Sequence, residues 1–406
     1  MKIKCFFQRV MTAALAVAMC LMLSGCMEGL TGQEGNMVDV VTPGSNEVGS
    51  AARAYQPTKK ADGTKFRIAY VDIDPYNVTF RQLYYAIENL KADGWLDYDT
   101  LPYDPEVDGD TQGLINWLIE NDRSEYLEFV KDANYYTYFD PKLEAEIQQS
   151  LVEHVTVKKD IDLILTMGTS PAALVKELNL DVPLLMYGVA DPIGSGLINS
   201  VEDSGGDYLW AHVDPSAYSR QMQYYYDTFG FTNIGTIYGD EIIAAMPEYR
   251  TIAAQNGFKL TEYRIERLQE DDAYYASISE ACHKMVETDR IDAFILTTNV
   301  FTDEAKAREI FQVFFEAGIP VFAQVGSNFV QEGACLMIVD TRDAVGCGPF
   351  ISNIIGSVLN GSLPGELEQE FISSPYLTMN LDVADAIGFK PTYEMLIACE
   401  KIICAD

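Results

Sequence analysis

From residue 65 to its end, the chain alternates short apolar runs with longer amphipathic stretches. Phe66–Val71 and Leu163–Met167 have the continuous apolar character of buried strands. Thr79–Lys91 and Pro171–Leu178 have the spacing of helices with one apolar face. Further strand-like runs are Ile234–Tyr238, Ala293–Thr297 and Val321–Gln324. This alternation predicts an α/β fold in which helices cover both faces of parallel sheets, and about 340 residues are enough for two domains.

The N-terminus follows a different pattern. Three basic residues within the first nine precede an apolar run of 13 residues, Met11–Leu23, which is too short to span a bilayer. Leu23-Ser24-Gly25-Cys26 resembles the lipobox of bacterial lipoproteins, in which the cysteine is acylated and becomes the first mature residue. We therefore predict a signal peptide at 1–25 and a lipid anchor on Cys26, which place the protein on the extracytoplasmic face of the cell membrane. The alternative is an ordinary secretory peptide with an incidental cysteine.

Residues 26–64 are rich in glycine, serine, threonine, asparagine and proline and lack apolar periodicity, so we predict a flexible tether. No later segment has 18 consecutive apolar residues. The formal charge of the whole chain is -33, and removal of the signal, which has three basic residues and no acidic one, changes it to -36. Such a charge argues against nucleic acid as a partner, but it names no ligand.

Cysteine and histidine are few and scattered. Cysteines 282, 335, 347, 399 and 404 lack C-x-x-C spacing, and the three histidines lie far apart, so we predict neither a metal site nor another cofactor. Buried thiols are the main expectation for the cysteines. A disulfide between Cys399 and Cys404 is the alternative.

In open parallel sheets, ligands lie at the carboxyl ends of the strands. The clearest turn at such an end is Gly168-Thr169-Ser170-Pro171, where we predict Ser170 as the N-cap and Pro171 as the first helical residue. The N–H groups of this turn would then face an anion such as a carboxylate. Ser170 could instead serve only its own helix, with Thr169 making the ligand contact.

Two stretches carry a family resemblance. Residues 164–173 (ILTMGTSPAA) and 182–198 (VPLLMYGVADPIGSGLI) resemble the ABC-transporter solute-binding proteins that include the tryptophan and tyrosine binders. Later motifs follow in the expected order, at Gly257-Phe258, Ile291–Ala293, Ile319–Phe322, Gly333-Ala334 and Met379–Leu381. The resemblance implies a type 1 periplasmic-binding-protein fold, with two doubly wound parallel-sheet lobes joined by three hinge crossovers.

We place lobe one at 65–212 plus 338–362 and lobe two at 213–337 plus 363–406. The resemblance also implies a monomer that captures a small solute, an aromatic or related amino acid, by closure of the lobes. The solute would be delivered to an ABC permease with its ATPase. A sensory lipoprotein that presents its ligand to a membrane receptor is the alternative.

The candidate ligand-binding residues lie at the ends of predicted strands or in the turns that follow them. We assign Thr169 and Ser170, after the turn at Gly168, to a carboxylate, and Asp74 or Asp191 to an ammonium group. Asp191 could instead cap the turn that follows it. The remaining candidates are Asn77, Asn299 and Gln324 for neutral hydrogen bonds, and Tyr76 or Tyr238 for stacking on a ring.

Two regions depart from the family pattern. Where the family has two glycines and an asparagine followed by threonine and glycine, this chain has Gly205-Gly206-Asp207-Tyr208-Leu209, and Tyr238–Glu241 lacks the family's asparagine and serine. The identity of the ligand is therefore the least safe inference from the resemblance. The segment 97–159 looks like an insertion, and its tyrosines 135, 136 and 138 form either ordinary packing, a lid, or aromatic walls for a ligand.

Enzymatic activity is not expected. The chain has no G-x-S-x-G elbow, H-E-x-x-H motif, Walker loop or G-x-G-x-x-G turn after a strand. Asp72 and Asp74 have period-two spacing at a strand end, where one of the two usually caps the turn.

Overall fold

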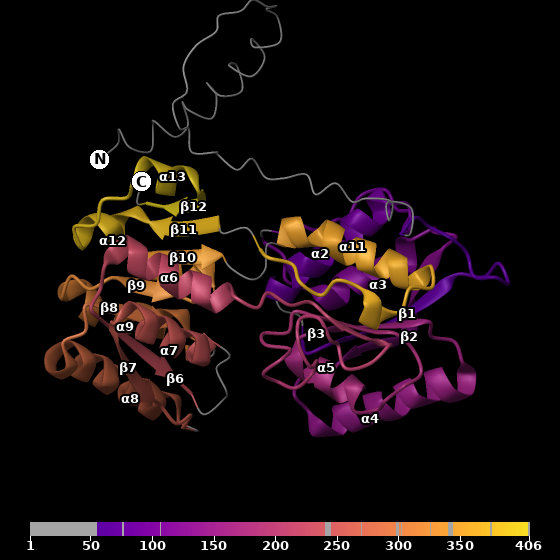
Figure 1. The fold of residues 1–406 in the computed structure, drawn as a ribbon, viewed down its shortest axis with the longest axis horizontal. Helices are drawn as coiled ribbons and strands as arrows, with labels where there is room; N and C mark the ends of the chain where they lie inside the picture. Colours follow the sequence, from indigo (N-terminus) through magenta and orange to yellow (C-terminus); the bar gives the residue numbers. More distant parts are fainter. Residues whose placement is uncertain are drawn as a thin grey trace, which may run out of the picture.

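The computed structural model describes residues 55–74, 77–105, 107–239, 245–268, 270–297, 300–301, 303–324, 326–339, 344–373 and 376–404. The predicted signal, the anchor at Cys26 and residues 26–54 of the predicted tether lie outside these residues. The tether prediction is wrong for residues 55–64, which are bonded to lobe one: Trp95 Nε1 donates to the Tyr55 carbonyl at 2.6 Å, and Lys60 pairs with Asp162 at 3.0 Å. The described chain forms two lobes side by side, each built on one sheet (Figure 1).

Lobe one contains a five-stranded sheet of order β2-β1-β3-β4-β5 in which all neighbours are parallel. Its strands are β1 (Phe66–Asp72), β2 (Leu127–Tyr136), β3 (Leu163–Met167), β4 (Leu184–Tyr187) and β5 (Leu209–Ala211). Its helices are α2 (Asn77–Ala92), α3 (Thr111–Asn121), α4 (Pro141–Val152) with the π-helical turn η1 (Glu153–Lys158), α5 (Thr169–Lys176), α11 (Ala344–Leu359) and the 3-10 turn η3 (Pro364–Glu366). Helix α11 belongs here because it packs on α2, although it follows the strands of lobe two in the sequence.

Lobe two contains a seven-stranded sheet of order β12-β11-β10-β9-β8-β6-β7 among the described residues. Its strands are β6 (Asn233–Tyr238), β7 (Lys259–Arg264), β8 (Ala293–Leu296), β9 (Val321–Ala323), β10 (Leu336–Val339), β11 (Tyr376–Asn380) and β12 (Cys399–Ile403). Its helices are α6 (Ala217–Phe229), α7 (Ala245–Asn256), α8 (Asp271–Lys284) with the π-helical turn η2 (Met285–Asp289), α9 (Glu304–Glu316), α10 (Ser327–Gln331), α12 (Leu381–Ala386) and α13 (Tyr393–Ile397). Strands β10 and β11 pair antiparallel, so this sheet departs from the all-parallel prediction at one step.

Each sheet separates two hydrophobic cores, as expected for a doubly wound fold. Along β1, Ile68 and Tyr70 face the core under α2, α3 and α11, whereas Ala69 and Val71 face the core under α4 and α5. Lobe two is built the same way, with one core under α6 and α7 and another under α8 and α9. Burial on both faces explains why the strands read as continuous apolar runs in the sequence.

The chain crosses between the lobes after β5, between β10 and α11, and again between η3 and β11. The first and third crossovers are joined by backbone hydrogen bonds. The Val213 N–H donates to the Gln369 carbonyl at 2.8 Å, and the Phe371 N–H donates to the Val213 carbonyl at 3.0 Å. These bonds keep the two strands together as one hinge.

The segment 97–159 is part of lobe one. It supplies α3, α4 and the edge strand β2, which pairs with β1. Tyr136 is buried against Tyr70 with ring centroids 6.1 Å apart, and the Tyr135 hydroxyl lies 2.8 Å from Ser150 Oγ. Tyr138 is half exposed. The packing alternative is therefore the right one for Tyr135 and Tyr136.

All five cysteines of the described body are free thiols. Cys282, Cys335 and Cys347 are buried, while Cys399 and Cys404 are partly exposed. Cys399 donates its S–H to the carbonyl of Met395 at 3.1 Å, and no Cys399–Cys404 disulfide forms. Among the described residues, no helix combines the length and the apolar character needed to cross a membrane.

Candidate functional site

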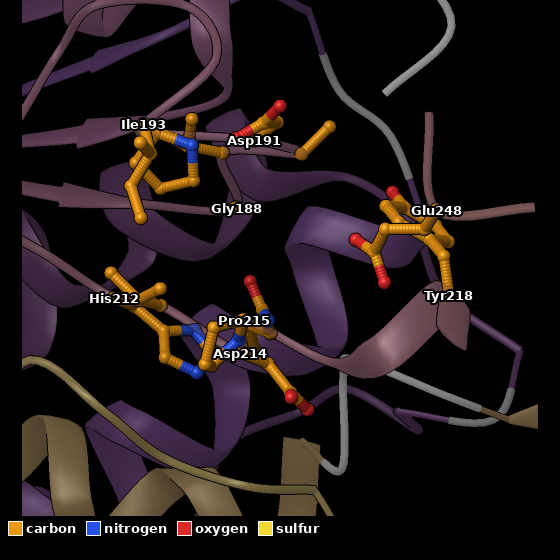
Figure 2. Close-up of a pocket in the computed structure, with 13 residues that line it drawn as sticks. Gly188, Asp191, Ile193, His212, Asp214, Pro215, Tyr218 and Glu248 are labelled. Atoms are coloured by element: carbon orange, nitrogen blue, oxygen red, sulfur yellow. The ribbon is translucent and has the colours of Figure 1, made fainter. Parts of the chain in front are cut away.

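A hollow that is partly open to solvent lies where the two lobes meet at the hinge (Figure 2). The hollow is enclosed by the turn after β4, by the first crossover after β5, and by the helices α6 and α7 of lobe two. Helix α2 contributes one more lining residue. The lining residues are Gln82, Gly188, Val189, Ala190, Asp191, Pro192, Ile193, His212, Val213, Asp214, Pro215, Tyr218 and Glu248. Both lobes thus contribute side chains to the same hollow.

The turn at Gly168 lies against one wall of this hollow. A Cβ atom placed on Gly188 would be 3.4 Å from the Gly168 nitrogen, and the Ala190 N–H donates to Thr169 Oγ1 at 3.4 Å. Helix α5 begins at Thr169, and Gly168 is its N-cap. The helix therefore starts two residues earlier than predicted, and the N-cap role of Ser170 and the first helical position of Pro171 are wrong. Gly168 takes the cap position because its φ of 97° and ψ of 162° suit only glycine.

Asp191 lines the hollow and also caps the turn that follows it. Its Oδ1 accepts a hydrogen bond from the Gly194 N–H at 2.7 Å, and its carbonyl accepts one from the Ser195 N–H at 3.0 Å. A Cβ atom on Gly194 would collide with the Asp191 carboxylate. The capping alternative is therefore correct, and the same carboxylate also faces the hollow.

Other sequence candidates lie elsewhere. Tyr238, at the end of β6, is partly buried, and Arg250 is a hydrogen-bond partner of its side chain. Gln324 is 1% exposed, and its carbonyl accepts from Gln221 Nε2 at 2.9 Å inside lobe two. Neither lines the hollow, nor does the partly buried Asp74.

The structure does not describe the side chains of the last three candidates. Tyr76 and Asn299 lie outside the described residues. Asn77 begins α2, but its side chain is outside the described part. Their assignment to ligand contacts remains a prediction.

Five polar side chains of the hollow were missed by sequence reasoning: Gln82, His212, Asp214, Tyr218 and Glu248. His212 and Asp214 follow β5, so the strand-end rule applies to them, but a strand of three residues gives too weak a sequence signal. Gln82, Tyr218 and Glu248 lie on or beside helices, where no local pattern marks a binding residue.

The charge of Asp214 is compensated within the hinge. Its side chain is 2% exposed and forms two hydrogen bonds with the Arg220 guanidinium, at 2.8 and 2.6 Å. It also accepts from the Ser373 N–H of the third crossover at 3.2 Å. His212 packs edge-on against the rings of Phe350 and Phe371, which stack on each other, and is 7% exposed. These contacts fix the hinge side of the hollow.

Asp72 ends β1 and is 1% exposed. Its carboxylate accepts hydrogen bonds from Tyr70 Oη at 2.8 Å, Thr111 Oγ1 at 2.9 Å and the Ile73 N–H at 2.8 Å. Burial raises the pKa of Asp72 to about 6, although these hydrogen bonds oppose the shift. As the sequence suggested, this carboxylate caps the strand end.

This shift predicts a specific pH dependence of stability. An acid whose pKa is raised by folding binds its proton more tightly in the folded state, so the free energy of unfolding falls as the pH rises from about 4 to about 6. The change from 3.8 to about 6 corresponds to a decrease on the order of 3 kcal/mol from Asp72 alone. In Asp72→Asn, the free energy of unfolding should no longer show this decrease between pH 4 and 6. Chemical denaturation of both proteins at several pH values in this range measures it. Parallel slopes for the two proteins would contradict the assignment.

Within the described residues, no group of three or more histidine, cysteine, aspartate or glutamate side chains is arranged to hold a metal ion.

Comparison with known proteins places this geometry in a family. A sequence model described as ABC transporter substrate binding protein matches residues 126–403, more than half of the chain. No curated protein matches the chain in sequence.

Solved structures show the same fold at low identity. An ABC domain from Streptococcus pneumonia in complex with L-Trp is 16% identical, with 84% of this chain and 100% of that chain covered and a TM-score of 0.59. A ligand-free, open substrate binding protein with adhesive properties from Clostridium difficile is 17% identical over 83% and 98% of the chains, with a TM-score of 0.60. A conserved domain protein from Vibrio cholerae is 18% identical over 84% and 100%, with a TM-score of 0.59. These structures have the type 1 periplasmic-binding-protein fold predicted from the sequence. The chain belongs to the ABC transporter substrate binding protein family.

Proposed function

We propose that this protein captures an amino acid in the hollow between its lobes and delivers it to an ABC permease. The observation that carries the proposal is the composition of the hollow, which takes side chains from the turn after β4, from the hinge and from α6 and α7. A ligand held by one lobe gains its remaining contacts only when the other lobe reaches it. Binding then favours the closed arrangement, which a permease can recognise.

The amino-acid class is supported by two features. The first turn of α5 begins at the wall of the hollow, and the N–H groups of Thr169 and Ser170 have no carbonyl partner within the helix, so they can face a carboxylate there. A structure with the same fold is a complex with L-Trp. The aromatic amino acids are therefore the first candidates.

A thermal-shift screen tests this proposal. Ligand-stripped protein should gain stability with amino acids, by about 2.7 kcal/mol at a ligand concentration of 100 times Kd, because the ligand binds only the folded state. Nucleosides, sugars and polyamines serve as the comparison sets. Stabilisation by one of these sets and by no amino acid would contradict the amino-acid proposal.

We further propose that acyl chains on Cys26 hold the protein at the extracytoplasmic face of the membrane. Residues 27–54 separate this cysteine from Tyr55, where the chain already contacts lobe one, and that length is enough for the lobes to stay within reach of a permease while they open and close. Two or more acyl chains give a stable anchor.

The anchor predicts a change of location. Cys26→Ser should move most of the protein from the membrane fraction to the soluble fraction or the medium, and the mass of the released protein should lack acyl groups. Cys399→Ser is the matched control, since that partly exposed thiol lies in the body. Membrane retention of Cys26→Ser equal to that of the control would refute the lipid anchor.

A further inference from the structure

Half of the six polar side chains around the hollow are carboxylates. Asp191, Asp214 and Glu248 bring three carboxylates to it, while no lysine or arginine is among its described lining residues. Asp214 is already paired with Arg220, which leaves Asp191 on lobe one and Glu248 on lobe two as carboxylates without an ion-pair partner among the described contacts. The hollow is therefore electrostatically negative and suits a positively charged guest.

Gln82 adds an independent sign of a ligand contact. It is 1% exposed, it lines the hollow, and its Oε1 has no hydrogen-bond partner among the described residues. This oxygen lies 3.5 Å from the position of a Cβ atom on Gly188, beside the turn that carries Asp191. Buried side-chain acceptors are nearly always paired, so an N–H donor is expected to occupy this place.

Glu248 faces this region from the other lobe. Its Oε2 accepts the Ser219 N–H at 2.7 Å, which holds the side chain at the start of α6 (Figure 2). Burial raises the pKa of Glu248, and the negative charges of Asp191 and Asp214 raise it further, while the hydrogen bonds from Ser219 lower it. The carboxylates of the two lobes therefore repel each other across the hollow, and a cation between them would turn repulsion into attraction.

We propose that the ligand carries a cationic nitrogen group that Asp191 of lobe one and Glu248 of lobe two bind from opposite sides, with Gln82 Oε1 accepting an N–H from the same ligand. The substrate class is an amino acid with a second, positively charged amine or guanidinium. This inference rests on the proposed function and narrows it. It also gives lobe closure an electrostatic cause, since a cation bound between the two carboxylates replaces their repulsion with attraction to a shared charge.

The test compares ligands that differ by one positive charge at nearly constant shape. The pairs are arginine with citrulline, and 4-aminomethylphenylalanine with 4-ethylphenylalanine, titrated calorimetrically into the stripped protein. We expect the cationic member of at least one pair to bind at least tenfold more tightly. Glu248→Gln should reduce that preference to less than threefold, because glutamine keeps an oxygen for the Ser219 N–H but loses the charge.

Glu262→Gln is the matched control. Glu262 is also in lobe two but is paired with Arg250 and does not line the hollow, so its loss should leave the preference unchanged. Equal binding of both members, or a preference that survives in Glu248→Gln, would overturn the cation inference while the amino-acid function stands. If no amino acid binds, both the inference and the proposed function fall.

Discussion

Replacing Trp210 with alanine is expected to lower the free energy of unfolding of lobe one by about 3 to 5 kcal/mol. Trp210 is 0% exposed at the centre of β5, and its ring lies 5.0 Å from that of Tyr187 and 5.8 Å from that of Phe350. Its Nε1–H donates to the Glu368 carbonyl of the third crossover at 2.8 Å. The substitution would leave a large cavity and an unpaired carbonyl where sheet, α11 and hinge meet.

Tryptophan fluorescence during chemical denaturation measures this effect selectively. All three tryptophans of the chain, Trp95, Trp117 and Trp210, lie in lobe one, so two remain as reporters in the variant. Trp210→Phe separates packing from hydrogen bonding, because it keeps an aromatic ring but cannot reach the Glu368 carbonyl, and it should cost about 1 to 3 kcal/mol. A loss below about 1 kcal/mol in the alanine variant would show that β5 does not tie the lobe to the hinge.

The strands could be predicted well where both faces are buried. The predicted strand Leu163–Met167 has the bounds of β3, and Ile234–Tyr238 differs from β6 by one residue, because an apolar run bounded by polar turns has few other interpretations. Edge strand β2 was hidden by its polar residues, which made the segment 97–159 look like an insertion. Strand β5 was too short to detect.

Only the part of the hollow that lobe one contributes could be predicted from the sequence. The rule that ligands lie at strand ends led to Gly168, Thr169 and Asp191, which line the hollow or touch its wall. Tyr238 and Gln324, chosen by the same rule, do not line the hollow, because it meets lobe two at α6 and α7 and not at the ends of β6 and β9. The orientation of one lobe against the other is set by the hinge contacts, which no local pattern encodes.

Gly168→Val is expected to weaken binding of the amino-acid ligand at least a hundredfold. At φ 97° a β-branched side chain is strained, and a Cβ atom would lie 2.9 Å from Ile73 Cδ1. Relief of the backbone strain or of the close contact moves the first turn of α5, whose N–H groups are proposed to hold the ligand carboxylate. A small displacement of these donors lowers the binding energy that they contribute. Calorimetric titration of the ligand found in the thermal-shift screen measures the loss.

Gly361→Val distinguishes this effect from general backbone strain. Gly361 has a φ of 98°, nearly that of Gly168, but a Cβ atom there would meet nothing within 4 Å, and the residue lies beyond the end of α11, away from the hollow. Its replacement should lower the stability by about 1 to 3 kcal/mol and leave Kd within about threefold of the original. If Gly168→Val binds as tightly as Gly361→Val, the first turn of α5 does not hold the ligand, and the carboxylate must be bound by other residues of the hollow.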